Sequence, residues 1–158
     1  MHIIYHCFGG SHSSVTSACI HAGLLKESKV PSAQDLLALP YYDKQVAQDH
    51  GYIRFIGHDE YGNSVYITSK HGLGKNYEDI MRSIASIADI PNKDLVFVDT
   101  MPYVNWLMVI GGYLSRRLGL VRIGRPIVIL GTQISFHKFC HIVKIIKTKY
   151  AKDNRQWP

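Results

Sequence analysis

Short, largely apolar segments separated by helical patterns are the feature that most limits how this chain can fold. Residues 2–7, 95–98 and 126–130 each form such a run, and the last two are rich in β-branched side chains. Strands that are buried on both faces of a parallel sheet have this composition. Strands that alternate with helices predict an α/β fold of three layers with a mostly parallel sheet. Helices are expected at residues 15–25, 32–39, 77–88, 104–118 and 135–150.

The domain organisation follows from the length of the chain. A chain of 158 residues favours one domain, which we place at residues 1–150, with a frayed tail at 151–158. Within it, residues 52–57 and 64–68 flank a turn that contains Gly62 and Asn63. This pattern predicts a β-hairpin inserted at residues 52–68.

Composition and charge narrow the classes of partner. Hydrophobic residues make up 46% of the chain and charged residues 19%, which excludes disorder for most of it. Residues 116–158 carry ten basic side chains and one acidic one, a net charge of +9, whereas residues 1–115 carry a net charge of −3. The asymmetry predicts an anionic partner for the C-terminal part: a nucleotide, a nucleic acid or an acidic protein. A solvated basic helix face is the alternative.

Cysteine usage and hydropathy predict a cytoplasmic protein with no membrane partner. Three cysteines cannot all pair, and no secretory signal opens the sequence. The longest apolar run, residues 104–114, is about half as long as a membrane span. Because this run is apolar almost all round, its helix should be deeply buried or packed against a second copy of the chain, so a homo-oligomer is expected as well.

The predicted fold places a binding site at one edge of the sheet. Ligands of open parallel sheets bind beyond the carboxyl ends of the strands. Four loops should meet there: residues 8–14, 69–75, 99–105 and 131–135.

The first of these loops has the composition of an anion-binding turn. Between a strand and a helix it offers unhindered backbone N–H groups and several hydroxyls as hydrogen-bond donors. Its candidate ligand-binding residues are Gly9, Gly10, Ser11, His12, Ser13 and Ser14. Its length matches a phosphate-binding P-loop, but His12 occupies the lysine position and only Ser13 fits the pattern. The alternative is a tight turn between strand and helix with a serine N-cap.

Cys7 opens the same loop. A phosphatase-type loop, in which a cysteine begins a phosphate cradle closed by an arginine, is absent, because residues 8–14 contain no Arg. We therefore interpret Cys7 as a buried, inert thiol.

The second and third loops offer complementary groups. Lys70, His71 and Lys75 could bracket a phosphate or supply the charge that the first loop lacks, or they form a solvated basic loop. Asp99 ends an apolar strand in the way of a Walker B motif, where it would hold Mg²⁺, although an aspartate there also caps turns.

Four more side chains complete the candidate site. Arg116 and Arg125 could each bind a phosphate through two guanidinium nitrogens, although an arginine at a helix C-terminus is also stabilised by the helix dipole alone. Asn105 and Gln133 could recognise a base or a ribose.

Several segments together resemble an uncharacterised family, a domain of unknown function found in small cytosolic proteins of Gram-positive, often spore-forming bacteria. The resemblance spans nearly the whole chain. It depends on residues 6–14 (HCFGGSHSS), 57–60 (GHDE), Asn105, 111–117 (GGYLSRR), 124–126 (GRP) and 131–133 (GTQ). It implies that these segments are shared family features and implies no activity.

The sequence thus predicts a domain that binds a nucleotide or another phosphorylated small molecule, in order to sense or sequester it. A divergent P-loop-like phosphotransferase or NTP hydrolase, with His12 and Asp99 as catalytic candidates and Mg²⁺ bound with a nucleotide, is one alternative. A nucleic-acid-binding protein that uses the basic C-terminal segment is the other.

Overall fold

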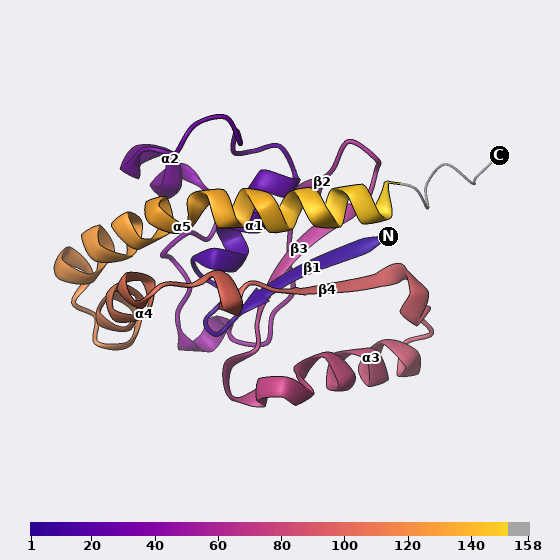
Figure 1. Cartoon of the computed structure of the whole chain (residues 1–158). Helices are drawn as coiled ribbons and strands as arrows, with labels where there is room; N and C mark the ends of the chain where they lie inside the picture. Colours follow the sequence, from indigo (N-terminus) through magenta and orange to yellow (C-terminus); the bar gives the residue numbers. More distant parts are fainter. Residues whose placement is uncertain (152–158) are drawn as a thin grey trace.

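The sheet has four strands, one of which lies at its centre and pairs with two parallel neighbours. The computed structural model describes residues 1–151. The strands are β1 (His2–Cys7), β2 (Arg54–His58), β3 (Ser64–Ser69) and β4 (Leu95–Asp99), in the spatial order β2-β3-β1-β4 (Figure 1). β1 runs parallel to β3 and to β4, and β2 pairs antiparallel with β3. The predicted mixed α/β fold with a mostly parallel sheet is confirmed.

The helices connect and cover these strands. They are α1 (Ser13–His21), α2 (Ala33–Ala38), α3 (Tyr77–Ile87), α4 (Trp106–Gly112) and the long α5 (Val121–Tyr150). A one-turn π-helix, Tyr113–Arg117, continues α4. α2 begins with a capping box, in which Ser32 Oγ accepts the Asp35 N–H and the Asp35 carboxylate accepts the Ser32 N–H.

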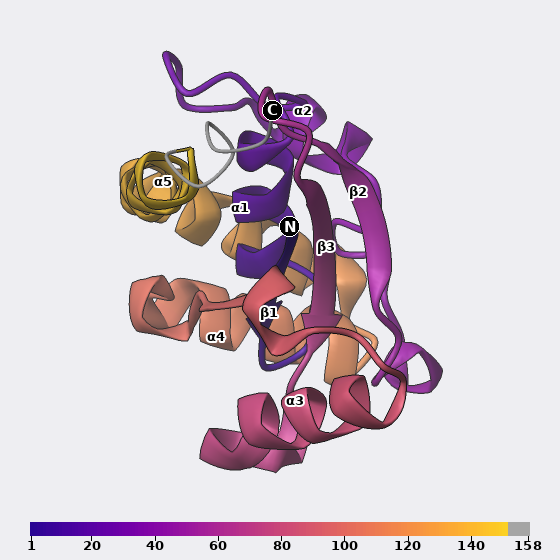
Figure 2. The same ribbon diagram turned by 90° about the vertical axis from the view of Figure 1, so that its right-hand side faces the viewer.

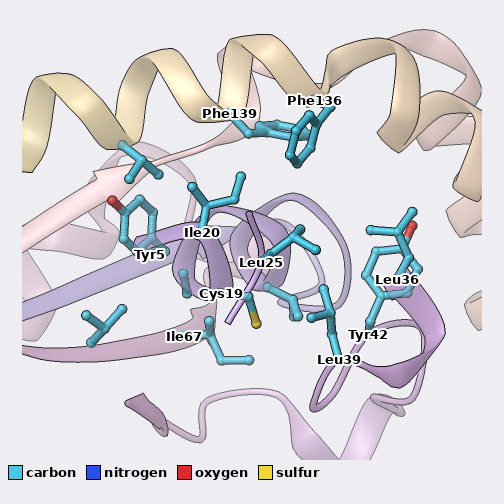
Figure 3. Packing of buried hydrophobic residues seen from close by; sticks show 14 of the residues in the cluster. Tyr5, Cys19, Ile20, Leu25, Leu36, Leu39, Tyr42, Ile67, Phe136 and Phe139 are labelled. Carbon is cyan, nitrogen blue, oxygen red and sulfur yellow. The ribbon is translucent and has the colours of Figure 1, made fainter. Parts of the chain in front are cut away.

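The main core lies between the sheet and the helices α1 and α5. Tyr5 and Ile67 of the sheet, Ile20 of α1, and Phe136 and Phe139 of α5 are all fully or almost fully buried in it (Figure 3). This cluster joins the N-terminal and C-terminal elements of the chain, because α1 and α5 pack against each other on the same side of the sheet (Figure 2).

A smaller cluster lies against α3. Its buried members are Ile4, Ala85 of α3 and Leu95, with Tyr66 and Phe97 partly buried beside them. Ile4 points to the opposite side of β1 from Ile3 and Tyr5, because side chains alternate along a strand. Whether the whole molecule forms the predicted three layers stays a prediction.

α4 and α5 pack closely because glycines face each other at their contact. A methyl group built on Gly111 would lie 2.4 Å from the backbone nitrogen of Val128, and one built on Gly124 would lie 2.3 Å from that of Ser115. A methyl group on Gly131 would meet the backbone nitrogen of Met108 at 2.7 Å. No side chain fits at these positions, so the three glycines determine how near the two helices approach.

The predicted strand at residues 126–130 is wrong, since this segment lies inside α5. Val128, Thr132, Phe136 and Phe139 are buried along one side of the helix at spacings of three to four residues. Packing of this helical face overrides the strand preference of β-branched residues, which is a weak and context-dependent bias. The predicted loop at residues 131–135 is also helical, so the fourth loop of the expected binding edge does not exist.

Deep burial of residues 104–118, one of the two arrangements expected for this helix, is wrong as well, whereas its packing against a second copy of the chain stays a prediction. α4 buries only Met108 and Gly111, and Trp106, Val109 and Ile110 are exposed on its outer side. The sequence of this helix is apolar on all sides, so its pattern does not show which side packs against the rest of the protein. Within residues 1–151, no helix combines the length and the apolar character that crossing a membrane requires. Of the predicted frayed tail, only Ala151, which is buried, lies within the described residues.

The glycine contact leads to a prediction about stability. Gly124→Ala should lower the free energy of unfolding by about 1–3 kcal/mol, because the new methyl group collides with backbone and forces α4 and α5 apart. Urea denaturation followed by circular dichroism measures the change. Gly72→Ala is the matched control, since a methyl group there meets no atom within 4 Å. Equal midpoints for the two variants would contradict the role given to the helix contact.

Candidate functional site

Three of the predicted loops meet at the carboxyl edge of the sheet. The Lys70 N–H donates to the Cys7 carbonyl and the His71 N–H donates to the Phe8 carbonyl, each at 2.9 Å. On the other side, Thr100 Oγ1 lies 3.0 Å from the His6 carbonyl and 2.9 Å from Ser13 Oγ. The loops that follow β1, β3 and β4 therefore contact one another directly.

Two of the predicted ligand-binding residues form hydrogen bonds that hold helices in place, and their binding role stays a prediction. Asn105 caps α4, because its Oδ1 accepts the Met108 N–H at 3.0 Å, and its Nδ2 donates to the Gly131 carbonyl of α5. Gln133 donates from Nε2 to the Pro31 carbonyl at 2.9 Å, which ties α5 to the segment before α2.

Asp99 and Lys70 form an ion pair with each other. Lys70 Nζ contacts Asp99 Oδ2, and Asp99 Oδ1 accepts the Met101 N–H at 2.9 Å. Both carboxylate oxygens are thus engaged by the protein, and Lys70 gives its charge to Asp99 rather than to the first loop. Among residues 1–151, no group of three or more His, Cys, Asp or Glu side chains is arranged to hold a metal ion.

His6 lies buried behind this ion pair. Its Nδ1 is 3.8 Å from Asp99 Oδ1, its Nε2 is 3.6 Å from Glu78 Oε1, and its ring packs against Tyr77. Burial lowers the pKa of His6, against the opposing effect of the Asp99 carboxylate. The imidazole is therefore favoured in its neutral form.

His71 and Lys75 lie at the surface of the second loop. The His71 ring packs against the rings of Phe8 and His50, with centroids 4.9 Å and 4.5 Å away. Lys75 is exposed in the short helical segment before α3. In the part of the chain that the structure describes, neither side chain forms a hydrogen bond with the glycine and serine residues of the first loop.

The first loop carries a series of backbone donors that the protein does not use. These donors are the N–H groups of Gly9 and of residues 11–15. None of them has a hydrogen-bond acceptor within the described chain. The hydroxyl of Ser11, which is buried, also lacks a partner there. Consecutive N–H groups at the start of a helix attract anions through their own dipoles and that of the helix.

The Cys7 thiol lies inside this loop. Its sulfur accepts the Gly10 N–H at 3.1 Å and is hydrogen-bonded to Ser14 Oγ at 3.3 Å. Gly10 has a positive φ of 66°, and a methyl group there would press on the backbone of Thr68 and Ser69. A glycine at this position lets the loop fold back onto its own cysteine.

Asp43 is the residue that connects the first loop to the rest of the site. Its side chain is fully buried, and Oδ1 lies 3.0 Å from His12 Nε2. Ser115 Oγ donates to the same carboxylate at 2.9 Å, Arg116 Nε lies 3.1 Å from Oδ1, and Arg125 Nε donates to Oδ2 at 2.7 Å. One carboxylate thus faces two guanidinium groups and an imidazole.

The position of Asp43 follows from the segment on either side of it. Tyr42 is fully buried, and its hydroxyl is hydrogen-bonded at 2.7 Å to Thr132 of α5. Asp43 has a positive φ of 50°, a conformation that aspartate tolerates better than most residues, and its N–H donates to the Ser11 carbonyl at 3.0 Å. Gln45 then donates to the Gly10 carbonyl at 2.6 Å. Residues 42–45 therefore lie directly over the first loop.

The π-helix brings the other side of the site into place. The Leu118 N–H bonds to the Tyr113 carbonyl five residues back, so each turn contains more residues than in an α-helix. Ser115 and Arg116 both reach Asp43 from this turn, and Arg117 points to the surface. Both site arginines donate from Nε, and within residues 1–151 their terminal nitrogens form no hydrogen bond.

A groove extends from Arg125 between α2 and α5. It has a volume of about 420 Å³, and apolar side chains such as Leu37, Pro126 and Ile129 form most of its wall. Arg122 also lines it.

Asp43 was not predicted from the sequence, although its partners His12, Arg116 and Arg125 were. It lies in a polar segment without glycine or a recognisable motif, so no local pattern singles it out. The signal that could have pointed to it is the small number of carboxylates available to pair with the arginines. Partly buried arginines favour a carboxylate partner, and few acidic residues precede the hairpin.

A second buried carboxylate, Asp59, belongs to a separate network. His21 Nε2 lies 3.0 Å from Asp59 Oδ2, and the Tyr5 hydroxyl lies 2.7 Å from His21 Nδ1. Burial lowers the pKa of His21. No arginine joins this network among the described residues, so we interpret the 57–60 segment as structural.

Asp43 and its partners His12, Ser115, Arg116 and Arg125, which we call the Asp43 cluster, should make the stability of the protein depend on pH. Burial alone would raise the pKa of Asp43, but hydrogen bonds from His12 and Arg125 outweigh it and lower the pKa from 3.8 to about 2. This stabilisation is complete above the ordinary pKa and is lost as the pH falls toward the folded value. Between pH 4 and pH 2, the free energy of unfolding of Asp43→Asn should therefore decrease by about 2 kcal/mol less than that of the wild type. Urea titrations at several pH values test this, and parallel profiles would contradict it.

Comparison with known proteins adds a family and no function. No match to a curated protein was found, and none to a solved structure. The family described as "protein of unknown function (DUF3189)" matches residues 2–148, which is nearly the whole chain and includes every residue of the Asp43 cluster. The chain therefore belongs to the DUF3189 family.

Proposed function

We propose that the protein binds the phosphate group of a nucleotide or of another phosphorylated small molecule at the first loop, and that it senses or sequesters this ligand. The observation that carries the proposal is the pair of arginines on Asp43. One carboxylate holds two guanidinium groups by their Nε atoms, which leaves one excess positive charge and the terminal nitrogens of both arginines unused. Bidentate arginine donors of this kind recognise phosphate.

The loop supports the same proposal independently. Its backbone N–H groups at residues 9 and 11–15 have no acceptor within the described chain, and His12 connects the loop to the arginines through Asp43. A P-loop uses a lysine as its permanent charge, which this loop lacks. Arg116 and Arg125 would provide that charge from the other side of Asp43.

The groove beside Arg125 favours a ligand larger than inorganic phosphate. Its mostly apolar wall would accept the remainder of a phosphorylated small molecule, such as a base. Asp99 is held by Lys70 and Met101, so no observation specifically favours the phosphotransferase alternative with Mg²⁺. That alternative and nucleic-acid binding stay predictions.

Binding can be tested with a panel of nucleotides and sugar phosphates, with inorganic phosphate for comparison and with and without Mg²⁺. A ligand at one hundred times its Kd should stabilise the protein by roughly 3 kcal/mol in a thermal shift assay. Arg125→Gln should weaken binding by about tenfold or more, because a charged hydrogen bond to the ligand is lost. Lys144→Gln, which removes an exposed charge far along α5, is the control and should bind as the wild type does.

Nuclear magnetic resonance can show whether the loop takes part. On addition of the best ligand, the largest shifts should appear at the amides of Gly9 and of residues 11–15. Shifts confined to Arg116 and Arg125 would restrict the site to the arginines and remove the loop from it. No stabilisation by any phosphorylated compound would overturn the proposal.

A further inference from the structure

The outer side of α4 is apolar and uncovered. Trp106, Val109, Ile110 and Tyr113 each expose between 45% and 69% of their surface. They are spaced three, four and seven residues from Trp106, so they share one side of the helix. The opposite side carries Met108 and Gly111, which are buried at the contact with α5. We call these four residues the outer face of α4.

The turn after the π-helix continues this apolar surface along the chain. Leu118 and Leu120 are about half exposed, and Gly119 between them has a positive φ of 69°. Ile123, in the first turn of α5, is also exposed. The α4–α5 hairpin lies at one end of the molecule (Figure 1). Apolar side chains that cluster at such a tip mark a contact surface.

The segment that carries this surface has charges of a single sign. Residues 100–151 contain no Asp or Glu. Arg117 and Arg122 flank the turn, and both are exposed. Neither arginine forms an ion pair within the described residues. A partner of this surface must therefore combine negative charge with apolar groups.

We propose that the outer face of α4 and the turn at residues 118–120 dock the protein onto an anionic lipid surface. The exposed tryptophan, tyrosine and aliphatic side chains would enter the interface between headgroups and acyl chains, while Arg117 and Arg122 contact the negative headgroups. This contact needs no membrane-spanning segment. The short length of the apolar run, which underlies the prediction of no membrane partner, therefore does not bear on it.

A second copy of the chain fits this surface less well. In a symmetric dimer the same patch meets itself, so the positive charges of Arg117 and Arg122 would face a patch of the same sign. With no carboxylate between residues 100 and 151, nothing on the hairpin would balance these charges.

The shape of the surface favours a lipid layer over a protein. The outer side of a single helix and a turn are convex, and a protein partner would have to supply a matching groove for them. A fluid lipid interface adapts to a convex apolar tip without one. A protein partner is therefore an outcome that the test must be able to reveal.

Tryptophan fluorescence tests the proposal directly. The chain has two tryptophans, Trp106 and Trp157, so Trp157→Phe leaves Trp106 as the only one. This full-length variant is mixed with vesicles of phosphatidylcholine alone or with phosphatidylglycerol added. The emission of Trp106 should shift to the blue with the anionic vesicles only, and the protein should sediment with them.

Two double variants, each with a matched control and made in the Trp157→Phe background, separate the contribution of the apolar side chains from that of the arginines. Leu118→Ser/Leu120→Ser should lower the partition coefficient about tenfold, whereas Ile84→Ser/Ile87→Ser, on the exposed side of α3, should not. Arg117→Glu/Arg122→Glu should lower it more than Lys26→Glu/Lys93→Glu, which changes the net charge equally at exposed sites elsewhere. All these positions are at the surface, so the variants should fold.

Three results would overturn the proposal. The first is an unchanged spectrum with both kinds of vesicle, which would leave a protein as the partner of this surface. Equal binding to neutral vesicles would show that the arginines play no part. A blue shift that grows with protein concentration without lipid, together with a dimer in light scattering, would assign the outer face of α4 to a second copy.

Discussion

The buried carboxylate of Asp43 is the group on which the organisation of the site depends. A charge taken out of water must be paired, and Asp43 is paired by groups from three distant parts of the chain: His12, the π-helix and Arg125 of α5. These contacts hold the first loop, the π-helix and α5 together at one carboxylate. Removing the carboxylate would therefore free the arginines and the loop at the same time.

The close contact of α4 and α5 makes this pairing possible. Gly111 and Gly124 bring the two backbones together, and the methyl group that Gly124 lacks would collide with the nitrogen of Ser115, itself a partner of Asp43. The glycines therefore act on the site through the backbone: a larger residue at either position would move Ser115 and Arg116 away from the carboxylate. The 111–117 and 124–126 segments thus belong to one structural unit.

The sequence predicted those parts of the molecule whose signal is local. The hairpin of β2 and β3 and the strand that ends at Asp99 both follow from neighbouring residues. The strand predicted at residues 126–130 was wrong because burial on one helical face, not β-branching, decides the conformation of that segment. No local pattern singles out Asp43, because its role arises only when distant segments meet. The binding of a phosphorylated ligand stays a prediction.

Arg116 and Arg117 are neighbours in the chain, yet their side chains point in opposite directions. Arg116 turns inward to Asp43, and Arg117 is exposed beside the apolar turn. The π-helix aims both Ser115 and Arg116 inward, so the next residue faces out. The hairpin therefore presents its guanidinium groups to the interior site on one side and to the surroundings on the other. A ligand that moved Arg116 would act on the turn that carries Leu118 and Leu120, because a single helical turn connects them.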